Sequence, residues 1–140
     1  MGERGVSSII VVIAIVVVIV ALLLVAGFVL LRKVPPPSRI LKENEILTEN
    51  DNGKTFGVQS GQSVIISLSI SYGEGDGGYT WNYPQDNSVA HIELLREVLG
   101  GTADFNVTII HSGTLVFKLA RSWEHNVPPV RTFSASFIII

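Results

Sequence analysis

The chain has 140 residues, of which 47% are hydrophobic and 16% are charged, with no cysteine and a formal net charge of -2. Without cysteine, disulfides, thiolate metal sites and cysteine nucleophiles are excluded. The few scattered basic residues exclude a nucleic-acid surface that works by neutralising phosphates. The length suits one domain, but the apolar residues are concentrated near the N-terminus, so the chain divides into two unlike parts.

The first part contains an uncharged apolar stretch, Ile9–Leu31. A helix over this stretch, rising about 1.5 Å per residue, would span roughly 34 Å, enough for a bilayer core of about 30 Å. The stretch is apolar on every face, which favours a spanning helix over one that lies on the membrane surface. We therefore expect residues 1–33 to form an N-terminal tail and one transmembrane helix, with the lipid bilayer as its partner through residues 9–31.

Two other interpretations of this segment stay open. A cleaved secretory signal is disfavoured, because the run is longer than the roughly 7–15 apolar residues of a signal-peptide core. A pilin-type leader is the other, since Arg4-Gly5 before a long apolar helix resembles the leaders of archaeal pilins. Many pilins have glutamate at the position where Ile10 stands.

A Pro-rich segment, Val34–Ser38, follows the apolar stretch and cannot continue a helix, so it predicts a short extended stalk. Isolated aliphatic residues after it are available for an edge strand, and Asn50–Gly53 reads as a turn. We expect residues 34–53 to be a Pro-rich stalk and linker.

The remainder, residues 54–140, shows the period-two alternation of β-strands. Val64, Ile66, Leu68 and Ile70 fall on one face, with serines on the other. Further strands are predicted at Tyr79–Tyr83, His91–Val98, Phe105–Ile109, Leu115–Leu119 and Phe133–Ile139. About seven short strands predict an all-β fold, an antiparallel β-sandwich.

Two local features of this part carry predictions of their own. His111-Ser112-Gly113 predicts a tight hairpin turn between two strands. The spacing within His91–Leu99 also allows a short amphipathic helix, although a strand is favoured.

Catalytic and metal-binding motifs have little support. His91, His111 and His125 do not have the spacing of metal ligands, and no Gly-x-Ser-x-Gly sequence is present. We expect a protein that is not an enzyme and that uses no cofactor or metal.

The run Gly73–Gly78 (GEGDGG) is the most unusual local sequence. The carboxylates of Glu74 and Asp76 would repel a phosphate, and two carboxylates without EF-hand spacing are few for calcium. A flexible loop between two strands accounts for the glycines through their conformational freedom.

Three predicted loop tips carry residues suited to recognising a protein. They are the end of the glycine-rich run with Gly78-Tyr79-Thr80-Trp81, the turn Leu99–Thr102, and Arg121-Ser122-Trp123. Exposed aromatic and arginine side chains on loops held by rigid strands are typical of binding hot spots. The alternatives are that Trp81 and Tyr79 pack in the core and that Arg121 only pairs with a carboxylate such as Glu124.

The order of these tips resembles the chagasin family of inhibitors of papain-like cysteine proteases, over roughly residues 54–140. Gly78-Tyr79 matches the end of the family's Asn-Pro-Thr-Thr-Gly-Tyr motif, and Gly100-Gly101 matches the end of its Gly-x-Gly-Gly motif. Arg121 and Trp123 match its Arg-Pro-Trp motif. The sequence departs from the family at residues 74–77, which read Glu-Gly-Asp-Gly, and at Val98 and Ser122.

The resemblance implies an immunoglobulin-like sandwich whose three loops bind the cleft of a papain-like cysteine protease reversibly and without a covalent bond. The protease-binding residues that it implies are Asp76, Gly77, Gly78, Tyr79, Gly100, Gly101, Arg121 and Trp123.

We expect, on these grounds, a single-pass protein of the cell membrane whose domain lies on the extracytoplasmic side. The basic residues after the apolar stretch, Arg32 and Lys33 among them, argue for the opposite orientation. Two alternatives belong to other classes. One is a pilin-like structural subunit with a sandwich head, and the other is a sandwich adhesion module assisted by calcium.

Overall fold

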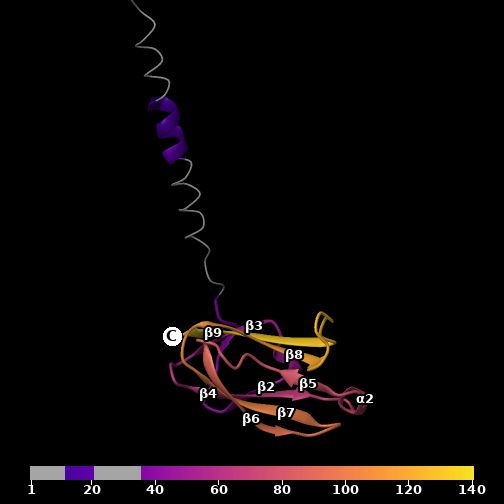
Figure 1. Cartoon of the computed structure of the whole chain (residues 1–140). Helices are drawn as coiled ribbons and strands as arrows, with labels where there is room; N and C mark the ends of the chain where they lie inside the picture. The colour runs from indigo at the N-terminus through magenta and orange to yellow at the C-terminus, as the bar shows by residue number, and fades with distance from the viewer. Residues whose placement is uncertain (1–11, 21–35) are drawn as a thin grey trace, which may run out of the picture. The chain divides into compact units, whose positions relative to one another are not determined.

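The computed structural model describes residues 12–20 and 36–140, and the chain divides into two units between Pro35 and Pro36. Residues 12–20 are helical (Figure 1). Among the described residues, no helix is both long enough and apolar enough to cross a membrane. Most of the predicted span Ile9–Leu31, and all of the pilin-type leader, lie outside the described residues.

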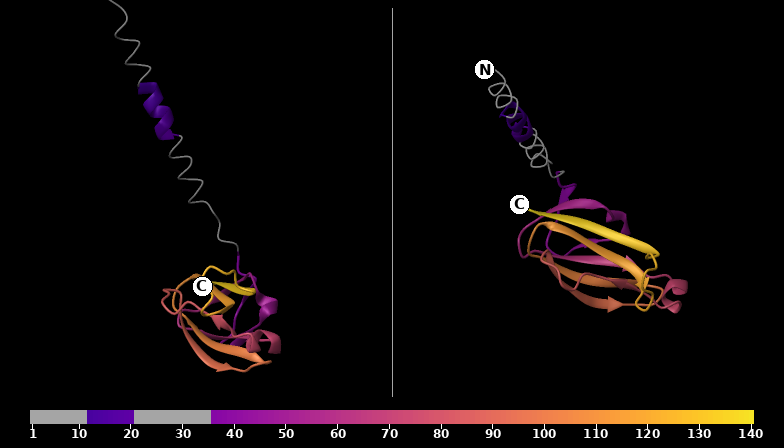
Figure 2. Two further views of the ribbon diagram at one scale, coloured as in Figure 1. Left: turned by 45° about the vertical axis from the view of Figure 1, so that its right-hand side comes forward. Right: turned by 45° about the horizontal axis from the view of Figure 1, so that its top comes forward.

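Residues 36–140 form two β-sheets packed face to face, so the predicted all-β sandwich is confirmed (Figures 1 and 2). In order across the first sheet, the strands are β1 (Arg39–Ile40), β3 (Lys54–Val58), β9 (Arg131–Ile139), β8 (Gly113–Arg121) and β5 (Tyr79–Asn82). The second sheet contains β2 (Glu45–Leu47), β4 (Ser63–Ser69), β7 (Thr102–Ile109) and β6 (Ala90–Glu97). Two short helices complete this part, the 3-10 helix η1 (Glu49–Asp51) and the α-helix α2 (Tyr72–Asp76).

The core lies between the sheets and follows the period-two alternation of the sequence. Buried and partly exposed residues alternate strictly along β4 and β7. Phenylalanines from both sheets meet in the centre, where the rings of Phe105 on β7 and Phe117 on β8 have centroids 5.0 Å apart. Trp81 is 4% exposed and belongs to this core. The sandwich is therefore a rigid support for the loops at its ends.

The sandwich was predicted to be antiparallel, but three of its strand pairs are parallel. β1 with β3, β2 with β4, and β3 with β9 run parallel. β3 leads into β4 of the other sheet, and in its own sheet it lies between β1 and β9, the last strand of the chain. A single sequence specifies which residues alternate but not which distant strand they pair with.

The predicted hairpin at His111-Ser112-Gly113 was also wrong. This segment crosses from β7 in one sheet to β8 in the other. The backbone N–H groups of Ile110 and His111 both donate to the carbonyl of Val89, at 2.8 and 3.0 Å, and Gly113 pairs with Phe137 of β9. Ser-Gly chemistry indicates a tight turn equally well for a hairpin and for a crossing between sheets.

The compact unit starts earlier than the predicted boundary at residue 54. It spans Pro36–Ile140, so β1, β2 and η1 all belong to it. Leu41 and Leu47, predicted to lie in a linker, are 4% and 0% exposed in the core. The segment predicted at residues 91–98 falls in the strand β6 (Ala90–Glu97), as favoured over a short helix.

Candidate binding site at one end of the sandwich

Three connections lie together at one end of the sandwich, which we call the loop end. The first loop is residues 71–78, the second is residues 98–101 and the third is residues 122–130. Figures 1 and 2 show two of these loops at the end opposite the C-terminus. The first contains α2, and the third is drawn in yellow.

The first loop is a helical turn, not the flexible loop expected from its glycines. Ser71 caps α2, its backbone N–H donates to Oε2 of Glu74 at 2.9 Å, and the two residues form a reciprocal capping box. The sequence Ser71-Tyr72-Gly73-Glu74 carries the Ser-x-x-Glu signature of such a box, so this helical start was readable from the sequence. The family motif at this position is absent, and a compact turn takes its place.

The first loop ends in two glycines that bring it under the third loop. Gly78 has φ +76°, in the left-handed region that favours glycine. A Cβ atom on Gly78 would overlap Cη2 of Trp123 and lie 3.1 Å from Cζ2. The indole of Trp123 therefore covers Gly78 while remaining 62% exposed. Asp76, the last residue of α2, is exposed beside them.

Arg121 joins the same two loops from the end of β8. Its Nε donates to the carbonyl of Gly77 at 2.5 Å, and its Nη1 pairs with Oε1 of Glu124 at 2.8 Å. The guanidinium also lies over the ring of Tyr79, 4.5 Å from the centroid, a cation–π geometry. Arg121 thus does pair with Glu124, and Tyr79 is half-buried at the start of β5.

The second loop is a tight turn that contacts the first loop through Leu99. The N–H of Gly101 donates to the carbonyl of Val98 at 2.9 Å, and Gly100 has φ +69°, as the third residue of a type II turn requires. Leu99 lies against Gly75 of α2, where a Cβ atom would overlap its side chain. A cavity of about 230 Å³ opens beside this contact, lined by Ile70, Gly75, Tyr79, Thr80, Glu97 and Leu99.

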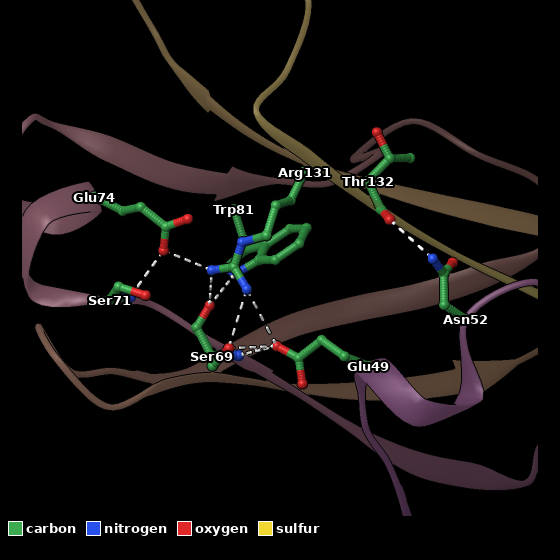
Figure 3. Close-up of polar contacts among 8 residues, drawn as sticks. All are labelled: Glu49, Asn52, Ser69, Ser71, Glu74, Trp81, Arg131 and Thr132. Atoms are coloured by element: carbon green, nitrogen blue, oxygen red, sulfur yellow. Dashed lines mark hydrogen bonds and ion pairs between the residues drawn. The ribbon is translucent and has the colours of Figure 1, made fainter.

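A polar network centred on Arg131 lies beneath the first loop (Figure 3). Nη2 of Arg131 donates to Oε2 of Glu74 and to the carbonyl of Ser69, both at 2.7 Å. The Oγ of Ser69 donates to Glu49 of η1 at 2.7 Å. The guanidinium faces the ring of Trp81 at 5.4 Å from its centroid. The network ties α2, β4, β9 and η1 together.

The electrostatics of Glu74 follow from this network. Burial raises the pKa of its carboxyl, but the hydrogen bonds from Ser71 and the charge and hydrogen bond of Arg131 outweigh burial and hold the pKa below its ordinary value. Glu74 is therefore a charged, partnered group and not a free carboxylate at the loop surface.

The structure brings the predicted site residues together at the loop end. Asp76, Gly77, Gly78, Tyr79, Arg121 and Trp123 form one contiguous group across the first and third loops, and Gly100 and Gly101 lie in the second loop. Glu74, Leu99 and Arg131 also contribute to the loop end, although they were not among the predicted site residues. Their roles depend on contacts between loops that are distant in sequence.

The described residues of the loop end do not form a metal site. The described part of the chain contains no cluster of three or more His, Asp or Glu side chains able to hold a metal. Nδ1 of His111 lies 2.7 Å from the carbonyl of Ser88, at the opposite end of the sandwich. What the loop end offers chemically is an exposed indole, an acidic side chain and glycine backbone.

Comparisons with known proteins bear on the class of protein that presents these three joined loops. No family model matches the chain, and no curated protein matches it. Among solved structures, it is similar to the cysteine protease inhibitor EhICP2 from Entamoeba histolytica, with 26% identity and a TM-score of 0.51. That match covers 74% of this chain and 99% of the inhibitor.

A second solved structure, that of amebosin, shares the fold. It is 20% identical, has a TM-score of 0.53, and the match covers 71% of this chain and 100% of amebosin. One of these structural neighbours is thus a cysteine protease inhibitor, which supports the resemblance to the chagasin family found from the three loop motifs.

Proposed function

We propose that the chain is a reversible inhibitor of papain-like cysteine proteases and that the loop end is its binding surface. The observation that carries this proposal is the joining of three loops at one end of a fold that a cysteine protease inhibitor shares. Such an inhibitor needs no nucleophile, because it works by occupying the active-site cleft.

The loop end has the composition of a binding hot spot. Trp123 supplies a large exposed apolar surface whose position is fixed by Gly78 and by the turn that follows Arg121. A fixed aromatic side chain loses little rotamer entropy on binding, so more of its burial appears as affinity. Trp123 is therefore the proposed anchor, with the glycine backbone of Gly77 and Gly78 allowing close approach.

The first loop gives this surface a shape of its own. A capped helical turn ending in Asp76 stands where the family resemblance would place the sequence Asn-Pro-Thr-Thr. We expect the turn to enter the cleft with its C-terminal end, where Gly77 and Gly78 lie beside Trp123. The second loop contributes Gly100 and Gly101 at the neighbouring edge.

The proposal includes a tether. The apolar stretch Ile9–Leu31 would hold the domain at the cell membrane, with the domain on the extracytoplasmic side. A tether raises the local concentration of the inhibitor near a protease that acts at the same surface.

Titration of papain with the full chain, kept in a mild non-ionic detergent, tests the proposal. We expect competitive inhibition of a small peptide substrate that reverses on dilution, because no covalent bond forms. Protection of the catalytic cysteine of papain from alkylation would place the inhibitor in the cleft. Unchanged papain activity at a large excess of correctly folded chain would refute the proposal.

A further inference from the structure

We propose that Arg121 and Arg131 are positioning residues that hold the first loop in its helical turn, ready for binding. This inference rests on the proposed function for its effect on the protease, but its effect on the loop is independent of it. The two arginines flank the third loop, one at the end of β8 and one at the start of β9.

The helical turn needs support from outside its own sequence. α2 has only five residues, and two of them, Gly73 and Gly75, are glycines. Isolated helices of this length are unstable in water, and each interior glycine costs about 1 kcal/mol relative to alanine. The capping box alone closes only the first turn.

Arg131 supports the start of the turn. It pairs with Glu74 at 2.7 Å, and Glu74 also accepts the N–H of Ser71, so the ion pair and the cap share one carboxylate. Nη2 reaches the carbonyl of Ser69 as well, which fixes α2 to the end of β4. Figure 3 shows the guanidinium between Glu74 and Ser69, against the ring of Trp81.

Arg121 supports the end of the turn. It donates to the carbonyl of Gly77, the C-cap of α2, which lies one residue before Gly78. Its second donor is held by Glu124 in the third loop. The guanidinium is planar and presents several fixed donors, so one side chain links both loops at once.

The consequence is that the first and third loops move as one body. Each end of α2 is bound by an arginine that belongs to the other loop's flanking strand. A loop already held in its binding conformation pays less ordering entropy on association. The guanidinium donors that hold α2 are used within the inhibitor and do not contact the protease. They therefore raise affinity by ordering the first loop.

Hydrogen exchange measured by NMR on the full chain in detergent tests the inference directly. The reporters are the amides of Gly75, Gly77 and Gly78, which donate to Ser71, Gly73 and Gly75 within the turn at 2.9, 3.2 and 2.9 Å. We expect Arg131→Met and Arg121→Met each to speed their exchange about tenfold or more, while amides of β4 and β7 keep their protection. Arg131→Lys should fall between, since lysine keeps the charge but has no planar fork.

Arg96→Met is the matched control. Arg96 donates to Oδ2 of Asp104 at 3.0 and 2.6 Å on the β6–β7 pair, so this variant also removes an arginine–carboxylate bridge. It should leave exchange in the first loop unchanged. The inference would be overturned if Arg121→Met and Arg131→Met left exchange in the first loop at the wild-type rate. It would also be overturned if Arg96→Met sped that exchange as much as they do.

Inhibition of papain provides the second readout. We expect Arg131→Met and Arg121→Met to weaken inhibition about tenfold, in step with the faster exchange. If the wild-type chain does not inhibit papain, the proposed function fails, while the exchange data still decide whether the arginines position the loop. Faster exchange with full inhibition would overturn the link between loop order and affinity.

Discussion

The indole of Trp123 lies directly over Gly78, so closely that any side chain at residue 78 would overlap it. Gly78 also has φ +76°, a backbone conformation that favours glycine independently of the indole. Two requirements therefore meet at one residue. This contact joins the first loop to the third, as the hydrogen bonds of Arg121 to Gly77 and Glu124 also do, although the residues are far apart in the sequence.

A substitution at Gly78 should disturb both the backbone conformation and the contact with the indole. Gly78→Ala should lower the free energy of unfolding by about 1–2 kcal/mol, because alanine is strained in the left-handed region. It should also displace the indole and shift the tryptophan fluorescence of the folded protein. Urea unfolding and emission spectra measure the two effects.

Gly61→Ala is the control for this substitution. Gly61 has φ +80°, but nothing lies within 4 Å of a Cβ atom there. It should show a similar loss of stability with an unchanged emission spectrum. An identical spectrum for Gly78→Ala and the wild type would contradict the contact with Trp123.

Removing the proposed anchor should affect binding and not folding. Trp123 is 62% exposed, so Trp123→Ala should change stability by less than about 0.5 kcal/mol. It should weaken papain inhibition by about 2 kcal/mol, roughly thirtyfold. Ile46→Ala, at a 59% exposed residue of β2, should leave inhibition unchanged. Equal inhibition by Trp123→Ala and the wild type would remove Trp123 from the binding surface.

The stability of the sandwich should depend on pH through Glu74. Its folded-state pKa lies below its ordinary value of 4.5, despite burial, because Ser71 and Arg131 stabilise the charged form. Its contribution is therefore fully present above pH 4.5 and is lost as the pH falls through the lower, folded-state pKa. Urea unfolding from pH 7 downwards should show a steeper acid loss for the wild type than for Glu74→Gln. Parallel pH profiles for the two proteins would contradict this role.

The N-terminal segment should bind bilayers. We expect the full chain to co-sediment with phosphatidylcholine vesicles and to stay with them at high salt, because burial of an apolar stretch is insensitive to ionic strength. Residues 36–140, prepared alone, should remain in the supernatant. Recovery of the full chain in the supernatant, and not with the sedimented vesicles, would contradict the tether.

The strands were predictable where alternation is strict and long. Val64, Ile66 and Leu68 fix the inner face of β4, and the same pattern fixes β7 and β9. β3 was missed because it is short and because Gly57 interrupts its pattern. Gly57 lies where a Cβ atom would be 3.3 Å from both Ile40 and Ile140, a close approach that appears only after folding.

The loop end was predictable in its composition but not in its assembly. The residues Gly78, Arg121 and Trp123 could be selected because aromatic and arginine side chains stand at strand ends. That Trp123 covers Gly78, or that Arg131 pairs with Glu74, depends on which strands become neighbours. Long-range pairing is the information that a single sequence does not display.

A hydrogen-exchange footprint of papain on the full chain tests most directly whether the loop end is the protease-binding surface. Protection is expected at residues 72–79, 98–102 and 121–130 when papain is added. The loops at the opposite end, residues 59–62 and 110–112, should exchange as they do in the free protein. A footprint confined to the opposite end, or no footprint at saturating papain, would contradict the assignment of the loop end as the protease-binding surface.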